Sequence, residues 1–234
     1  MTPEEFQKFY PVLLGWIDTT LRAHAGNTQN VVSRGFSRLP LYFSADTLAS
    51  AKVVLVEKLP IPPLSSWGLT RFADFERGNF DGITYLNTFF IMRAELKNEA
   101  VHFHELIHVV QWRILGPEQF LRSYADGLER LGYRDNPLEV MAYDAEAAFT
   151  ANDIFDAEKI VARKRASRVA NVRSSPESRH VQRTSRCPLS ANSGHCVCGF
   201  KRNKAATRRA PMLINGFAQR RCVVSRAWLR GRIA

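Results

Sequence analysis

One predicted helix of this chain carries three polar side chains among apolar neighbours. His104, Glu105 and His108 form the pattern His-Glu-x-x-His within residues 98–115, where most of the other residues near them are Val, Leu, Ile and Trp. Four residues of α-helix turn the chain by about 400° and advance it about 6 Å, so the two imidazoles lie one above the other. Burying these groups without a partner is costly, and a bound metal ion would supply that partner.

This pattern is typical of a zinc site. Two histidines on consecutive turns can both bind one tetrahedral Zn²⁺, while the intervening glutamate lies beside the ion. The alternative is a pair of core histidines satisfied by hydrogen bonds. With 6 His and 13 Glu in 234 residues, chance produces the pattern in roughly one such chain in a hundred. The zinc site is therefore the favoured interpretation.

A catalytic zinc site needs a third protein ligand. Glu139 is the best candidate, because it lies 31 residues beyond His108, at the start of another predicted helix. The helix–loop–helix between them allows the chain to fold back. Two alternatives remain: Glu139 as an acid favoured by the helix dipole, and Glu146 as the ligand, two turns further along.

The order of predicted elements indicates an α+β fold, with strands first and three helices after them. Residues 59–64 contain three prolines and are expected to form an extended loop. Pro11 is expected to bend or split the first helix. The predicted helices span residues 3–25, 45–51, 98–115, 117–131 and 136–163, and the predicted strands span residues 41–43, 52–57 and 82–91.

The charge of the chain divides it into two parts. Residues 1–160 hold 15 Lys and Arg against 21 Asp and Glu, a net charge of −6, whereas residues 161–234 hold 18 against 1, a net charge of +17. We therefore predict a domain over residues 1–165 and a basic, poorly ordered tail over residues 166–234. All four cysteines (Cys187, Cys196, Cys198 and Cys222) lie in this tail.

Three interpretations of the tail compete. It is an extension with no selected role, of the kind that a changed reading frame produces; a basic arm that binds nucleic acid; or a small metal knuckle of its cysteines with His195. The Cys-x-Cys spacing is poor for zinc, so we favour the first. No apolar run reaches membrane-spanning length, and the N-terminus lacks the pattern of a secretion signal. We accordingly expect no membrane span and a cytoplasmic protein.

The His-Glu-x-x-His helix followed by the distant helical Glu139 resembles the gluzincin group of zincin metallopeptidases, loosely over residues 40–160. Residues 104–111 (HELIHVVQ) are also similar to the zincin-like domain found with extracellular contractile injection systems. The resemblance implies a small sheet packed on the motif helix, with His104, His108 and Glu139 holding Zn²⁺. Glu105 would be the general base that takes a proton from the water attacking a peptide carbonyl. An edge strand, here residues 82–91, would pair with extended substrate.

Zincins also need a donor to the developing oxyanion. Tyr143, one turn after Glu139, is the first candidate, and Tyr133 and His102 are weaker ones; each could instead be a packed aromatic or a surface histidine. Gln111 shares the metal-facing side of its helix and is expected to support His108, unless it merely faces solvent.

Two functions follow from the resemblance. The first is a zinc-dependent endopeptidase that acts on a peptide or protein substrate, with Glu105 and Tyr143 as catalytic residues. The second is a zincin-like protein that binds the metal but serves in binding or regulation. The intact Glu105 favours the enzyme. Nucleic-acid binding ranks third, because it depends wholly on the tail.

Overall fold

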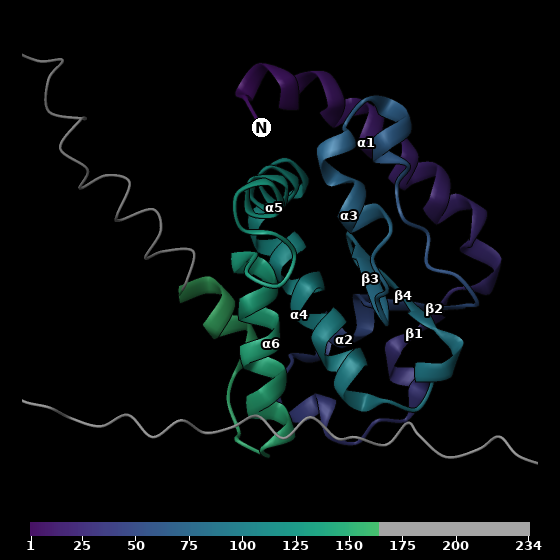
Figure 1. Cartoon of the computed structure of the whole chain (residues 1–234). Coiled ribbons are helices and arrows are strands. Elements are labelled where there is room, and N and C mark those ends of the chain that lie inside the picture. Colours follow the sequence, from purple (N-terminus) through teal and green to yellow (C-terminus); the bar gives the residue numbers. More distant parts are fainter. Residues whose placement is uncertain (164–234) are drawn as a thin grey trace, which may run out of the picture. The chain divides into compact units, whose positions relative to one another are not determined.

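The computed structural model describes residues 1–163, in which helices surround a small mixed sheet (Figure 1). The predicted α+β class is thereby confirmed. The predicted boundary at residue 165, the tail of residues 166–234 and the interpretations of its cysteines lie outside the described residues. Within residues 1–163, no helix combines the length and the apolar character that a membrane span requires.

The sheet places one short strand at its edge. Its strand order is β1-β2-β4-β3, with β2 and β4 parallel and the other two pairs antiparallel. Strand β3 therefore ends the sheet on one side, and β4 lies inside it. The four strands are β1 (Gln29–Asn30), β2 (Lys52–Val56), β3 (Gly82–Tyr85) and β4 (Thr88–Met92).

Residues 82–91 form a hairpin, so the prediction of one continuous strand was wrong. The chain reverses at Leu86 and Asn87, and Tyr85 pairs with Thr88 across this two-residue turn. Leu86 takes a positive φ of 59°, which is unusual for a branched apolar residue and is not signalled by its residue type. As a result, of the two strands of this hairpin only β3 lies at an edge of the sheet.

Helix α1 (Pro3–Ala23) covers one side of the sheet (Figure 1). The side chain of Thr2 accepts a hydrogen bond of 3.1 Å from the backbone N–H of Glu5 and so caps the helix. Pro11 lies inside the helix without splitting it. Ile17, which is 1% exposed, packs in the same apolar cluster as Val54 of β2, and such packing offsets the hydrogen bond that Pro11 removes.

The strand predicted at residues 41–43 is absent from the described structure. Leu39–Leu41 form a single turn of 3₁₀-helix, and the N–H of Tyr42 donates to the Leu39 carbonyl at 3.1 Å. The ring of Tyr42 packs edge-on against Phe103 and Phe149, with centroids 5.4 and 5.1 Å away. These aromatic residues therefore bury themselves by packing on helices instead of pairing in a sheet. Helix α2 (Ala45–Ser50) follows, close to its predicted position.

The later helices start where the sequence predicts. Helix α4 (Glu99–Leu115) is capped by Asn98, whose side chain accepts from the Ala100 N–H at 3.2 Å, and it ends at Gly116 with a positive φ of 75°. The remaining helices are α3 (Ala73–Glu76), α5 (Pro117–Leu131) and α6 (Pro137–Thr150).

Helix α6 is shorter than predicted, because it was expected to continue to residue 163. Asn152 adopts a left-handed conformation with φ of 63°, and the N–H of Asp153 donates to the Ala148 carbonyl at 3.0 Å. These features end the helix. Residues 157–163 are helical again.

Helix α4 lies between the sheet and α6 (Figure 1). Every residue from Val101 to Trp112 is buried. Phe103 stacks on Phe149 of α6 at a centroid distance of 4.3 Å, while His102 packs edge-on against Phe89 of β4. The polar side chains of this helix are therefore enclosed in protein, and each must find its partner there.

Candidate metal centre

Two imidazoles of α4 face one another across a single turn. His104 and His108 have ring centroids 4.9 Å apart, and their Nε2 atoms are separated by 3.1 Å. Both side chains are buried, with 7% and 5% of each residue exposed. The spacing of four residues in a helix is sufficient to produce this arrangement.

Helix α6 brings Glu139 to the same place. Asn136 caps the helix by accepting from the Leu138 N–H at 3.1 Å, so Glu139 lies in the first turn. Its Oε2 lies 3.4 Å from Nε2 of His104, and its Oε1 lies 3.4 Å from Nε2 of His108. One ligand atom from each of the three side chains falls within 4.8 Å of the others. The structure therefore gathers the three predicted ligands into one buried group.

The other nitrogen of each imidazole already has a partner. Nδ1 of His104 lies 3.0 Å from Oε2 of Glu146, and Nδ1 of His108 lies 2.9 Å from Oε1 of Gln111. Gln111 is oriented by its own amide, which donates to the Leu138 carbonyl at 3.0 Å. Both Nδ1 atoms therefore act as donors, and in the neutral rings both Nε2 lone pairs point toward Glu139.

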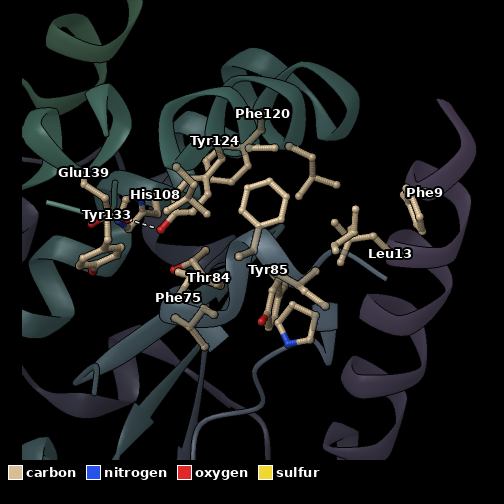
Figure 2. A pocket seen from close by; sticks show the side chains of 18 of the residues that line it. Phe9, Leu13, Phe75, Thr84, Tyr85, His108, Phe120, Tyr124, Tyr133 and Glu139 are labelled. Atoms are coloured by element: carbon tan, nitrogen blue, oxygen red, sulfur yellow. Dashed lines mark hydrogen bonds and ion pairs between the residues drawn. The ribbon is translucent and has the colours of Figure 1, made fainter. Parts of the chain in front are cut away.

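Glu139 leaves one oxygen free for a cation. Tyr124 of α5 donates a hydrogen bond of 2.6 Å to its Oε1 (Figure 2). Its Oε2 is buried and has no hydrogen-bond partner among the described residues. A buried carboxylate oxygen beside two imidazole lone pairs is an acceptor-only group. The donor set of two imidazoles and one carboxylate is therefore suited to a divalent metal ion.

The charges of the three side chains are strongly coupled. Burial lowers the pKa of His104, but the nearby carboxylates of Glu139 and Glu146 outweigh burial and raise the pKa to about 10. Burial also lowers the pKa of His108, and the Glu139 carboxylate again reverses the effect and raises it. Burial raises the pKa of Glu139, whereas the two imidazoles bring it well below its usual range. Without a metal, the group thus retains a proton in the place that a cation would take.

Glu105 lies beside the triad and is held from β3. The hydroxyl of Thr84 donates to Oε2 of Glu105 at 2.6 Å. Burial raises the pKa of Glu105, while His108 and His104 oppose that rise. A Cβ added at Gly82 would lie only 2.5 Å from Oε1 of Glu105. The backbone of β3 at Gly82 thus lies so close to the Glu105 carboxylate that a residue with a side chain would collide with it.

The candidate oxyanion donors differ in their surroundings. The ring of Tyr143 packs on His104 at a centroid distance of 4.7 Å, and its hydroxyl lies 3.4 Å from that of Tyr133. Burial raises the pKa of both tyrosines, so both hydroxyls retain their protons. His102, in contrast, is packed between aromatic rings, with its Nδ1 2.9 Å from the Asn98 carbonyl. Of the three candidate donors, only Tyr143 and Tyr133 thus belong to the surroundings of the triad.

Several residues of the centre were not identified from the sequence. Thr84 and Gly82 come from a hairpin that was predicted as a single strand, and Tyr124 comes from a helix to which no role was given. Glu146 was considered only as a ligand, but it contacts the outer nitrogen of His104. Tyr124 lies 15 residues before Glu139, and no spacing rule connects two residues on different helices.

Comparison with known proteins provides no relative for this centre. No protein family, curated protein or solved structure matched the chain. The resemblance to gluzincins therefore remains an expectation from the sequence.

Proposed function

We propose that the protein is a zinc-dependent peptidase. The observation that carries this proposal is the group of three lone-pair donors (His104, His108 and Glu139) buried in one place, with the outer nitrogen of each imidazole already bonded. In the metal-free protein a proton occupies this position, and a metal ion would bind all three donors in its place.

The ligand spacing supports zinc as the metal. Nitrogen and oxygen ligands lie about 2.0–2.2 Å from tetrahedral Zn²⁺, which places neighbouring ligand atoms about 3.3–3.6 Å apart. The separation of 3.1 Å between the imidazole nitrogens and the separation of 3.4 Å between Nε2 of His104 and Oε2 of Glu139, the free carboxylate oxygen, are close to that value. When bound, zinc would supply Lewis-acid chemistry, polarising a carbonyl and lowering the pKa of a water molecule.

Glu105 is suited to the role of general base. Thr84 occupies its Oε2, so Oε1 is the oxygen that would accept a proton from the attacking water. Burial raises the pKa of Glu105 toward the range in which a carboxylate both takes and returns a proton. The same oxygen would then deliver the proton to the leaving amine.

Two further features support a peptide as the substrate. The protonated hydroxyls of Tyr143 and Tyr133 would donate to a developing oxyanion. In an antiparallel pair of strands, residue pairs that are hydrogen-bonded to each other alternate with pairs that are not. Because the Met92 N–H donates to the Asp81 carbonyl, the backbone N–H and C=O groups of Gly82 and Thr84 point away from β4. These groups would pair with an extended peptide, except for the Thr84 carbonyl, which accepts from the Trp112 indole at 3.1 Å.

The test compares metal content and hydrolysis in three variants of the full-length chain. The wild type should bind about one zinc per chain by elemental analysis and cleave a peptide library. His108→Ala should lose the zinc. Glu105→Gln should keep the zinc and lose cleavage, whereas Glu57→Gln, whose side chain is 80% exposed, should keep both. A folded wild type that takes up no added zinc, or cleavage that survives Glu105→Gln, would refute the proposal.

One observation favours a second function, that of a non-catalytic zinc protein. Glu105 and Glu139 are only 4% and 2% exposed, and catalysis requires access for water and substrate. A zinc site of this kind would serve folding or binding of a partner. Zinc bound without any cleavage, equally in the wild type and in Glu105→Gln, would favour this function.

A further inference from the structure

An apolar pocket begins at the metal centre and extends away from it. Its volume is about 120 Å³, and one end is lined by Thr84, His108 and Glu139. Figure 2 shows these side chains on one side of the pocket and Phe9 and Leu13 of α1 on the other. The pocket therefore lies between the candidate reaction centre and the N-terminal helix.

The walls of the pocket beyond the centre are mainly hydrocarbon. Helix α1 contributes Phe9 and Leu13, α5 contributes Phe120 and Leu128, and the segment before α3 contributes Phe72. A polar or charged group placed among such side chains would lose its hydrogen bonds to water without replacement. The pocket is therefore selective for apolar groups.

The volume decides what kind of apolar group fits. Pockets that bind drug-sized ligands have volumes of about 300–1,000 Å³. This pocket is smaller than that. An engineered apolar cavity of about 150 Å³ binds benzene. A volume of 120 Å³ is thus suited to one ring or one branched aliphatic group, and not to a long chain.

We propose that this pocket receives one large apolar side chain of the substrate, phenylalanine or leucine, next to the peptide bond that is cut. The inference rests on the proposed peptidase function and names its substrate class. The backbone of that residue would lie at the His108 and Glu139 end, where the polar groups of the pocket gather, and its side chain would extend toward α1. Peptides with a charged or small residue at that position would be poor substrates.

Binding of hydroxamates to the zinc-loaded full-length protein tests the proposal without measuring turnover. Acetohydroxamate reports metal binding alone, and derivatives with an ethyl, isobutyl or benzyl group add an apolar group of increasing size. Affinity should rise about fourfold for each added CH₂ and should stop rising beyond benzyl. Equal affinity across the series, or affinity that continues to rise to a dodecyl group, would overturn the proposal; the second result would indicate an acyl chain as the occupant.

A variant that fills the pocket provides the second test. Ala125 of α5 lines the pocket, and Ala125→Phe should reduce benzyl hydroxamate affinity at least tenfold while leaving acetohydroxamate affinity unchanged. Leu131→Phe is the matched control, because Leu131 lies on the same helix and is 52% exposed. Benzyl affinity that is unchanged in Ala125→Phe would refute the proposed location.

Failure of the pocket and failure of the peptidase function give different results. If the protein binds no zinc, acetohydroxamate will not bind either, and the peptidase proposal fails. If zinc and acetohydroxamate bind normally but the benzyl group gives no gain, the zinc site stands and only the pocket proposal is overturned.

Discussion

Tyr124 donates a hydrogen bond of 2.6 Å to Oε1 of Glu139, and Oε2 of the same carboxylate is left buried without a hydrogen-bond partner among the described residues. A helix outside the motif thus decides which carboxylate oxygen is available to a cation. The motif helix supplies the two imidazoles, but the orientation of the candidate third ligand depends on α5.

The first prediction concerns this hydrogen bond. Tyr124→Phe removes the hydroxyl and leaves Oε1 of Glu139 without its donor, so zinc affinity should fall about 10- to 100-fold, the usual effect of removing such outer partners. Competition with a chromogenic chelator measures this change. Tyr10→Phe is the control, because the hydroxyl of Tyr10 has no described role at the centre. Equal zinc affinity in the two variants would show that Tyr124 does not support the ligand.

The second prediction concerns Gln111, which joins His108 to the start of α6. Gln111→Leu removes the acceptor of His108 Nδ1 and the donor to the Leu138 carbonyl, two buried hydrogen bonds. Zinc affinity should fall about 10- to 100-fold, and the metal-free protein should lose about 1–3 kcal/mol of unfolding free energy, because buried polar groups lose their partners. Chemical denaturation of the metal-free protein separates the stability effect from the metal effect. Unchanged zinc affinity would place Gln111 outside the support of the site.

The third prediction concerns the passage of β3 past Glu105. In Gly82→Ala the new methyl group would meet Oε1 of Glu105 at 2.5 Å, so the carboxylate must move. We expect zinc content to be retained and hydrolysis to fall at least tenfold, because Glu105 is not a metal ligand but would be displaced from its role as base. Elemental analysis and a peptide cleavage assay check the two parts. Full activity in this variant would mean that the carboxylate position is not critical.

The fourth prediction concerns pH. The pKa of His104 is raised to about 10 in the folded protein, above its ordinary value of 6.5. The proton on His104 therefore stabilises the metal-free fold fully below pH 6.5, and this stabilisation is lost as pH rises toward 10. The melting temperature of the metal-free protein should accordingly fall by several degrees between pH 7 and 9.

Zinc binding should show the opposite trend over the same range. The metal must displace the proton from His104, so zinc affinity should rise by up to about tenfold per pH unit between pH 7 and 9. Calorimetry in buffers of different ionisation enthalpy should detect the released proton. Zinc affinity that is independent of pH, with no proton release, would contradict the coupling of His104 to Glu139.

The elements that the sequence predicted best are those with clear end signals. Asn98 and Gly116 bound α4, and Pro117 begins α5, because caps and prolines act on the backbone locally. The predictions that were wrong depended on tertiary packing or on unusual backbone angles. Leu86 turns the hairpin with a positive φ, and Tyr42 packs on helices, and neither residue type signals such behaviour.

The candidate site divides in the same way. His104, Glu105 and His108 follow from a spacing within one helix, and Glu139 was found as an acid at the start of another. Apart from Gln111, the side chains that orient them could not be found by spacing. Thr84, Tyr124 and Glu146 reach the centre from three different elements, and their proximity depends on how those elements pack.

Thr84 has a consequence for substrate alignment. Its side chain binds Glu105 and its carbonyl binds Trp112, so one strand residue contacts α4 at two points that lie two helical turns apart. A shift of the strand by one residue would turn Thr84 to the other face and break both bonds. The position of a peptide paired with β3, relative to the carboxylate of Glu105, would therefore be set by a single residue. In the proposed peptidase, the register of the bond to be cut would depend on Thr84, which would neither bind the metal nor take up the proton.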